Sequence, residues 1–223
     1  MAINLVKGQK INLEKDNGSR LTNFCVGCNW GAITEEKKGW FGFGRTENKD
    51  VDLDLSCILI DKDGRIIDHI YSPEYREDFL NRYGMPKGQL ATRDKALKHS
   101  GDDRKGDQNG NDGLDNEIIT VDLDRVNPQV DQIYFFLNNV GPEDFAKIPY
   151  ASIRMYEGTP DRVREVFARY DVAADPAYAS KRALVMGKLY RKNNSWKFDA
   201  IGDPTNDANL CETINRITRQ YSK

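Results

Sequence analysis

Residues 51–60 read VDLDLSCILI, and the turn DKDG at 61–64 leads into RIIDHIY at 65–71. The first segment has the apolar and β-branched composition of a strand, and it is the clearest strand pattern in the chain. Asp and Gly are typical of tight hairpin turns, so the two segments predict an antiparallel hairpin. Short strand patterns of this kind recur along the chain, with turn residues every ten or so positions. We therefore expect an all-β fold, a sandwich of two mainly antiparallel sheets.

Similar patterns extend outward from this hairpin in both directions. Predicted strands lie within 4–16 (two short strands turning near Gly8) and at 21–30, 96–100, 118–123, 132–140, 150–157, 183–191 and 195–201. Residues 163–173 fit a helix and a strand equally well. Short helices are predicted at 74–83, ended by Gly84, and at 206–221, capped by Asn206 or Asp207. No linker or repeat divides the chain, so residues 1–223 are expected to form one domain.

Composition and charge exclude several classes of protein. The 223 residues carry a net charge of −2 with 30% charged residues. No basic stripe with interleaved aromatic residues is present, which argues against nucleic acid as a partner. No apolar run is long enough for a transmembrane segment, and the N-terminus lacks the apolar core of a signal peptide. We expect a cytoplasmic protein.

Four cysteines, Cys25, Cys28, Cys57 and Cys211, do not indicate a zinc site or a disulfide framework. The CVGC spacing of Cys25 and Cys28 lies in a predicted strand, where these two positions point to opposite faces. No second pair completes four ligands. Buried structural thiols are the expected role.

Two acidic clusters are the candidates for function. Alternation along the strand places Asp50, Asp52 and Asp54 on one face, where three carboxylates repel one another unless a cation or water separates them. The second cluster, DDRKGDQNGNDGLDNE at 102–117, holds five Asp, one Glu, three Asn and three Gly. By itself this run fits either a site for a hard divalent cation such as Ca²⁺ or a solvated loop. It does not match an EF-hand, because the sixth position of the frame from Asp107 is Asp112 and the twelfth is Ile118.

Catalytic interpretations have less support. His99 and Ser100 adjoin the acidic run, but neighbours on a strand point apart, and His69 is expected to be structural. The enzymatic alternative is a metal-dependent hydrolase that acts on a phosphate ester or nucleotide through the acidic residues. We expect the protein not to be an enzyme.

The Gly-rich stretch GWFGFG at 39–44 is not a phosphate-binding loop, because it lacks the Lys-Ser/Thr ending. Its aromatic residues Trp40, Phe41 and Phe43 are a candidate partner surface, with a hairpin tip folded on its own rings as the alternative.

Several segments, in order along nearly the whole chain, carry a resemblance to a known family. They are NLVKGQKINLEK (4–15), VDLDLSCILID (51–61), HSGDDRKGD (99–107), LDNEIITVDL (114–123), YASIRMYE (150–157), EVFARYDVA (165–173) and ALVMGKLYRKNNSWKFDAIGD (183–203). In this combination the chain resembles the TerD-type tellurium-resistance and stress-response proteins of bacteria. The long aromatic stretch 31–50 departs from the family pattern.

The resemblance implies a β-sandwich that binds Ca²⁺, usually two ions, and acts as a calcium-dependent binding or scaffold module. It implies protein partners in a stress-response complex, including at the inner face of the membrane. The metal ligands carried over or considered beside them are Asp52, Asp54, Asp102, Asp103, Gly106, Asp107, Asn109, Asp112, Asp115, Asn116 and Glu117. Asn109 and Asp112 lie in the longer middle of the acidic run, where the match is weakest. A further interpretation is a purely structural calcium site that supports another surface, such as Trp40–Phe43.

Overall fold

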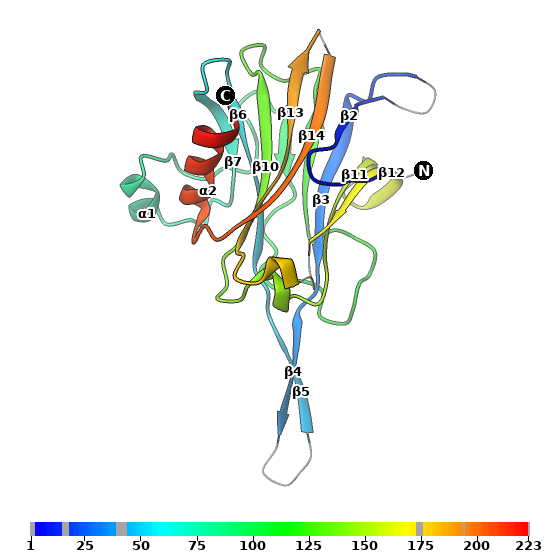
Figure 1. The fold of residues 1–223 in the computed structure, drawn as a ribbon, viewed down its shortest axis with the longest axis vertical. Coiled ribbons are helices and arrows are strands. Elements are labelled where there is room, and N and C mark those ends of the chain that lie inside the picture. The colour runs from blue at the N-terminus through cyan, green and yellow to red at the C-terminus, as the bar shows by residue number, and fades with distance from the viewer. Residues whose placement is uncertain (1–2, 15–17, 39–43, 173–175, 194, 223) are drawn as a thin grey trace.

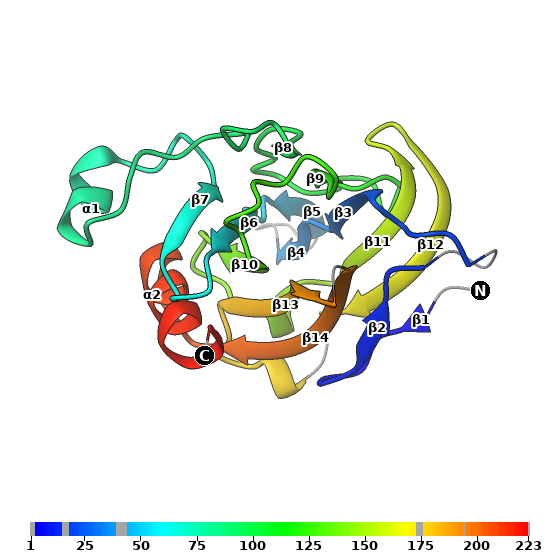
Figure 2. The same cartoon turned by 90° about the horizontal axis from the view of Figure 1, so that it is seen from above.

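The computed structural model describes residues 3–14, 18–38, 44–172, 176–193 and 195–222. Two six-stranded sheets pack face to face, as Figures 1 and 2 show. Sheet one has the order β1 (Ile3–Asn4), β12 (Arg162–Asp171), β11 (Ala151–Thr159), β3 (Asn23–Trp30), β9 (Glu117–Asp122) and β8 (Leu97–His99). Sheet two has the order β2 (Lys10–Asn12), β14 (Ser195–Thr205), β13 (Ala183–Lys192), β10 (Gln132–Asn139), β6 (Leu53–Ile60) and β7 (Ile66–Ile70).

The pairing is antiparallel in both sheets, except that β1 pairs parallel with β12. The predicted fold class is therefore confirmed. The helical elements are α1 (Glu77–Arg82), α2 (Leu210–Arg216) and the short turns η1 (Phe145–Lys147), η2 (Pro176–Tyr178) and η3 (Ile217–Tyr221). No helix among the described residues is both long enough and apolar enough to cross a membrane.

The predicted strand at 51–60 forms β6, and all eight of its residues are buried. One face of β6 meets sheet one, where Leu53 and Leu55 share the main core with Trp30. The other face carries Ile58 and Ile60, which pack under α2 in a second apolar cluster. In Figure 2, α2 lies beside sheet two at β7 and β10. The strand is apolar on both faces at its C-terminal half because both faces are covered.

Three details of the sequence-based prediction are settled by the structure. In the ambiguous segment 163–173, residues 163–171 belong to strand β12, whose long pairing with β11 outweighs the helical spacing of the apolar residues. The two N-terminal strands turn at Gly8, but β1 joins sheet one and β2 joins sheet two. The cap of the C-terminal helix was predicted wrongly: the side chain of Asn209 accepts the hydrogen bond from the Glu212 N–H at 3.1 Å.

Strands β4 (Ile33–Lys38) and β5 (Gly44–Lys49) form a two-stranded ribbon that projects from one end of the sandwich (Figure 1). Trp40, Phe41 and Phe43 lie outside the described residues. Cys25 and Cys28 are both buried and free, and they belong to different apolar clusters on the two faces of β3.

Candidate metal centre

Three carboxylates from two parts of the sequence meet at the start of β6. Asp52 precedes the strand, Asp54 is its second residue, and Asp102 follows β8. One oxygen from each of the three lies within 4.8 Å of the others. Asp54 is buried, while Asp52 and Asp102 are half-buried. The structure thus brings Asp52 and Asp54, at the start of β6, next to Asp102, the first residue of the acidic run.

The three carboxylates are poorly compensated by the protein. Burial, together with the charges of Asp102 and Glu117, raises the pKa of Asp52 from 3.8 to about 6. Burial raises the pKa of Asp54 well above its ordinary value, although the hydroxyl of Tyr75 donates to its Oδ2. Oδ1 of Asp52 and Oδ1 of Asp102 are buried and have no hydrogen-bond partner among the described residues. Buried carboxylate oxygens without partners are energetically costly, and a cation would satisfy them.

A cavity of about 190 Å³ lies against these carboxylates. Its other lining residues are Ser72, Glu74, Tyr75, Arg104 and Val140. Arg104 and Glu74 form an exposed ion pair at 2.6 Å. The positive charge of Arg104 offsets part of the rise in the pKa of Asp52. The cavity offers only oxygen donors to an ion, which is the ligand chemistry of hard cations such as Ca²⁺.

Glu117 connects the acidic run to the strand beneath it. Its Oε2 accepts a hydrogen bond from the Leu55 N–H at 2.7 Å, and its Oε1 accepts one from the Asp103 N–H at 3.1 Å. Nε2 of His99 lies 3.4 Å from Oε2. Burial raises the pKa of Glu117, while the His99 contact lowers it. Both oxygens are therefore used in fixing the loop against β6.

A second polar group forms where the acidic run crosses the end of β3. Asp107 accepts from the Asn116 Nδ2 at 3.1 Å, from the Asn29 Nδ2 at 3.1 Å and from the Tyr150 hydroxyl at 2.8 Å. Oδ1 of Asn116 accepts from the Trp30 N–H at 2.8 Å. Oδ1 of Asn29 is buried without a hydrogen-bond partner among the described residues.

Asp103 turns the loop between the two groups. Its Oδ1 accepts from the backbone N–H groups of Lys105 at 2.9 Å and Gly106 at 3.0 Å. Its Oδ2 lies 3.4 Å from the Asn116 Nδ2, which places Asp103 beside the second group. Gly106 has φ +69°, and a Cβ there would lie 2.6 Å from the Trp30 ring. Only glycine allows the loop to pass this close to the indole.

Within the residues that the structure describes, the remaining sequence-predicted ligands do not share hydrogen bonds with either group. Asp115 is paired with Arg154, whose Nε lies 2.9 Å from Oδ1 and 3.0 Å from Oδ2. Asp112 is exposed and accepts from the Leu114 N–H at 2.8 Å, and Asn109 is exposed. A ligand role for these three residues stays a prediction, and the structure gives the Asp115 carboxylate a different partner.

The sequence interpretation missed Asn29, Glu74, Tyr75 and Tyr150. Asn29 is a buried polar residue between Cys28 and Trp30 in β3, and this was the one available signal. The other three come from segments that reach the site only through the fold.

Together, the fold and the site define a class: an all-β sandwich with a cluster of carboxylates that could hold a metal ion. The comparisons with known proteins narrow this class. The sequence matches the profile of the TerD domain over residues 1–216. The chain belongs to the TerD domain family, as the resemblance implied.

Relatives cover nearly the whole chain. "Tellurium resistance protein TerX" of Serratia marcescens is 31% identical over 211 residues, which is 92% of this chain and 94% of the relative. "Stress response protein SCP2" of Bacillus subtilis is 29% identical over 220 residues, which is 97% and 99% of the two chains. A crystal structure of a homologue of the telluride resistance protein TerD from Streptomyces coelicolor has a TM-score of 0.57 at 13% identity. It covers 91% of this chain and 98% of its own, and it supports the fold.

Proposed function

We propose that this chain is a calcium-binding module of the stress-response and tellurium-resistance type, and that it works as a scaffold and not as an enzyme. The observation that carries the proposal is the Asp52, Asp54 and Asp102 group, in which two buried oxygens have no hydrogen-bond partner in the described part of the chain. The names of the relatives support the stress-response role. The all-oxygen donor set supports Ca²⁺ as the ion.

Two ions are proposed, one at each polar group. The first would be held by Asp52, Asp54 and Asp102, with Glu74 at the edge of the same cavity. The second would be held by the group of Asn29, Asp103, Asp107 and Asn116. A bound cation supplies positive charge, which offsets the repulsion among carboxylates that burial brings together.

The protein residues around the sites fix the loop in the position that an ion needs. Glu117 ties the loop to β6, and Gly106 lets it pass the Trp30 ring. A cation bound there would link β6, the start of the acidic run and the end of β3. Binding to the folded chain alone stabilises it by mass action. We propose that this linkage orders one end of the sandwich for a partner, within one domain over residues 1–223.

A calorimetric Ca²⁺ titration of chelator-treated protein tests the proposal. We expect Asp102→Asn to weaken the tighter binding event about tenfold or more, because a charged ligand is lost. Asp63→Asn is the matched control, since it removes the same charge at an exposed position that is outside the predicted ligand set. The proposal fails if wild-type protein takes up no Ca²⁺, or if the two variants behave alike.

The hydrolase alternative uses the same carboxylates and makes a different prediction. A hydrolytic metal centre needs an open position beside a substrate pocket. The cavity of about 190 Å³ is smaller than the roughly 300–1,000 Å³ of common ligand pockets. Turnover of a phosphate ester with Mg²⁺ or Mn²⁺, lost in Asp102→Asn, would favour the enzyme.

A further inference from the structure

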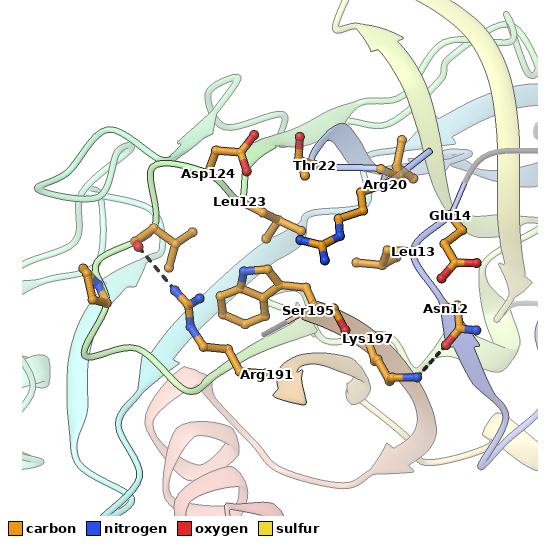
Figure 3. A pocket seen from close by; sticks show the side chains of 14 residues that line it. Asn12, Leu13, Glu14, Arg20, Thr22, Leu123, Asp124, Arg191, Ser195 and Lys197 are labelled. Atoms are coloured by element: carbon orange, nitrogen blue, oxygen red, sulfur yellow. Dashed lines mark hydrogen bonds between the residues drawn. The ribbon is translucent and has the colours of Figure 1, made fainter. Parts of the chain in front are cut away.

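A larger cavity lies at the other end of the sandwich. It has a volume of about 500 Å³ and opens between the ends of the two sheets (Figure 3). Thr22, just before β3, lines this cavity, whereas Trp30 at the far end of β3 contacts the acidic run. Eight strand residues rise roughly 25 Å, so the two places are well separated.

The floor of this cavity is apolar. Leu13, Leu21, Leu123 and Val126 line it, and each is only 3–5% exposed. All four also belong to the main core between the sheets. The cavity is therefore an opening onto the core.

One wall is aromatic and is held in place by an arginine. Trp196 in β14 packs against the main core and lies opposite Arg191 of β13 in the strand register. The guanidinium of Arg191 lies 4.3 Å from the centre of the indole ring. Its Nε donates to the Val130 carbonyl at 2.8 Å, and Nη2 lies 3.4 Å from the Val126 carbonyl. These contacts fix the cation and the aromatic ring as one rigid unit.

The mouth of the cavity carries further positive charge. Figure 3 shows the guanidinium of Arg20 turned toward the middle of the cavity. Lys197 lies on the rim and donates to Asn12 Oδ1 at 2.7 Å. Among the described residues, none of the three cations has an ion-pair partner, although Glu14 and Asp124 also line the cavity.

We propose that this cavity binds a small organic anion with a planar apolar body. The ring of the ligand lies against Trp196 and the leucine floor, and its acidic group lies at Arg20. Ligand pockets commonly combine an apolar surface with a few fixed polar groups, at volumes of about 300–1,000 Å³. The surplus of cations selects an anion, and the aromatic wall selects a flat one.

The test uses ligand titrations followed by NMR of the tryptophan indole N–H groups. The probes are 2-naphthalenesulfonate, the uncharged 2-naphthalenemethanol, and sulfate. We expect saturable binding of 2-naphthalenesulfonate with a shift of the Trp196 signal. The Trp30 indole, which donates to the Val51 carbonyl at the opposite end, is the internal control and should not move. The other two probes should bind at least tenfold more weakly, because each lacks half of the recognised chemistry.

Arg20→Gln is the decisive variant, and it should weaken 2-naphthalenesulfonate binding about tenfold. Lys192→Gln is the matched control, because Lys192 is exposed on the same hairpin as Arg191 and Trp196, is not among the lining residues and carries the same charge. The proposal is overturned if 2-naphthalenesulfonate does not bind or leaves Trp196 unshifted. It is also overturned if the alcohol binds equally well, or if the two variants lose affinity equally.

Discussion

Asp52→Asn should have opposite effects on stability with and without calcium. In the metal-free protein, Asp52 lies against Asp54 and Asp102, and burial raises its pKa from 3.8 to about 6. The folded protein binds this proton more tightly than the unfolded chain does. Stability is therefore lost as pH rises between these two values, and the loss is complete above about pH 6.

The size of this effect follows from the displaced pKa. For a fully buried group, a change from 3.8 to about 6 corresponds to roughly 3 kcal/mol of lost stability. Asp52 is half-buried, and solvent screening reduces the figure to about 1.5 kcal/mol. Asp52→Asn should recover about this amount at about pH 8 in chelator, which is roughly 3–6 °C in melting temperature for a chain of this size.

With calcium the sign reverses. Free Ca²⁺ at 100 times its dissociation constant stabilises the wild-type protein by about 2.7 kcal/mol, and Asp52→Asn should lose most of this. The assay is thermal unfolding of both proteins at about pH 5 and about pH 8, in chelator and in excess Ca²⁺. Asp50→Asn is the control, since Asp50 is exposed and outside the carboxylate group. The reasoning is refuted if Asp52→Asn destabilises the metal-free protein at about pH 8, or if Asp50→Asn behaves identically.

Three further predictions follow from single contacts, each measured by urea unfolding. Tyr75→Phe should destabilise the metal-free protein by about 1–3 kcal/mol, because it removes the hydroxyl that donates to the buried Asp54; an unchanged midpoint would contradict this. Gly106→Ala should lower the free energy of unfolding by about 1–3 kcal/mol more than Gly110→Ala does, because both glycines have positive φ but only Gly106 faces the Trp30 ring. Equal losses in the two variants would show that the ring moves aside freely. Asp207→Asn should lower the free energy of unfolding by about 2 kcal/mol, because the Asp207 carboxylate accepts from Arg216 Nη2 at 2.7 Å and Nε at 2.8 Å. A loss below about 0.5 kcal/mol would show that this ion pair contributes little to stability.

Much of the fold was predictable because its strands carry local signals. The alternation in 51–60, the DKDG turn and the apolar run at 132–140 each predict an element that the structure contains. The segment 163–173 was not resolvable by periodicity, since its partner β11 decides its conformation. The position of the helix cap was missed because Asn206, Asp207 and Asn209 are all good capping residues. Which of them caps the helix depends on where the backbone turns helical, and in the structure that is at Leu210.

The candidate site was predictable to a smaller extent. The strand alternation placed Asp52 and Asp54 on the same face, and the acidic run supplied Asp102. The partners of the other carboxylates depend on which strands are neighbours. Arg154 reaches Asp115 because β11 lies beside β3, and Tyr150 reaches Asp107 for the same reason. Side chains that meet only through sheet order leave no pattern in the local sequence.

The charge distribution gives the two ends of the sandwich different chemistry. The carboxylate group and the acidic run lie at one end of β3, and the cavity with Arg20, Arg191 and Lys197 lies at the other. Seven of the eight residues of β3 are buried, and antiparallel neighbours pair with the strand on both sides. We expect a strand that is closely packed and paired on both sides to keep the same arrangement whichever site is occupied. We therefore expect calcium at the carboxylate group and an organic anion in the cavity to bind independently. The affinity for each ligand should then be the same whether or not the other is bound.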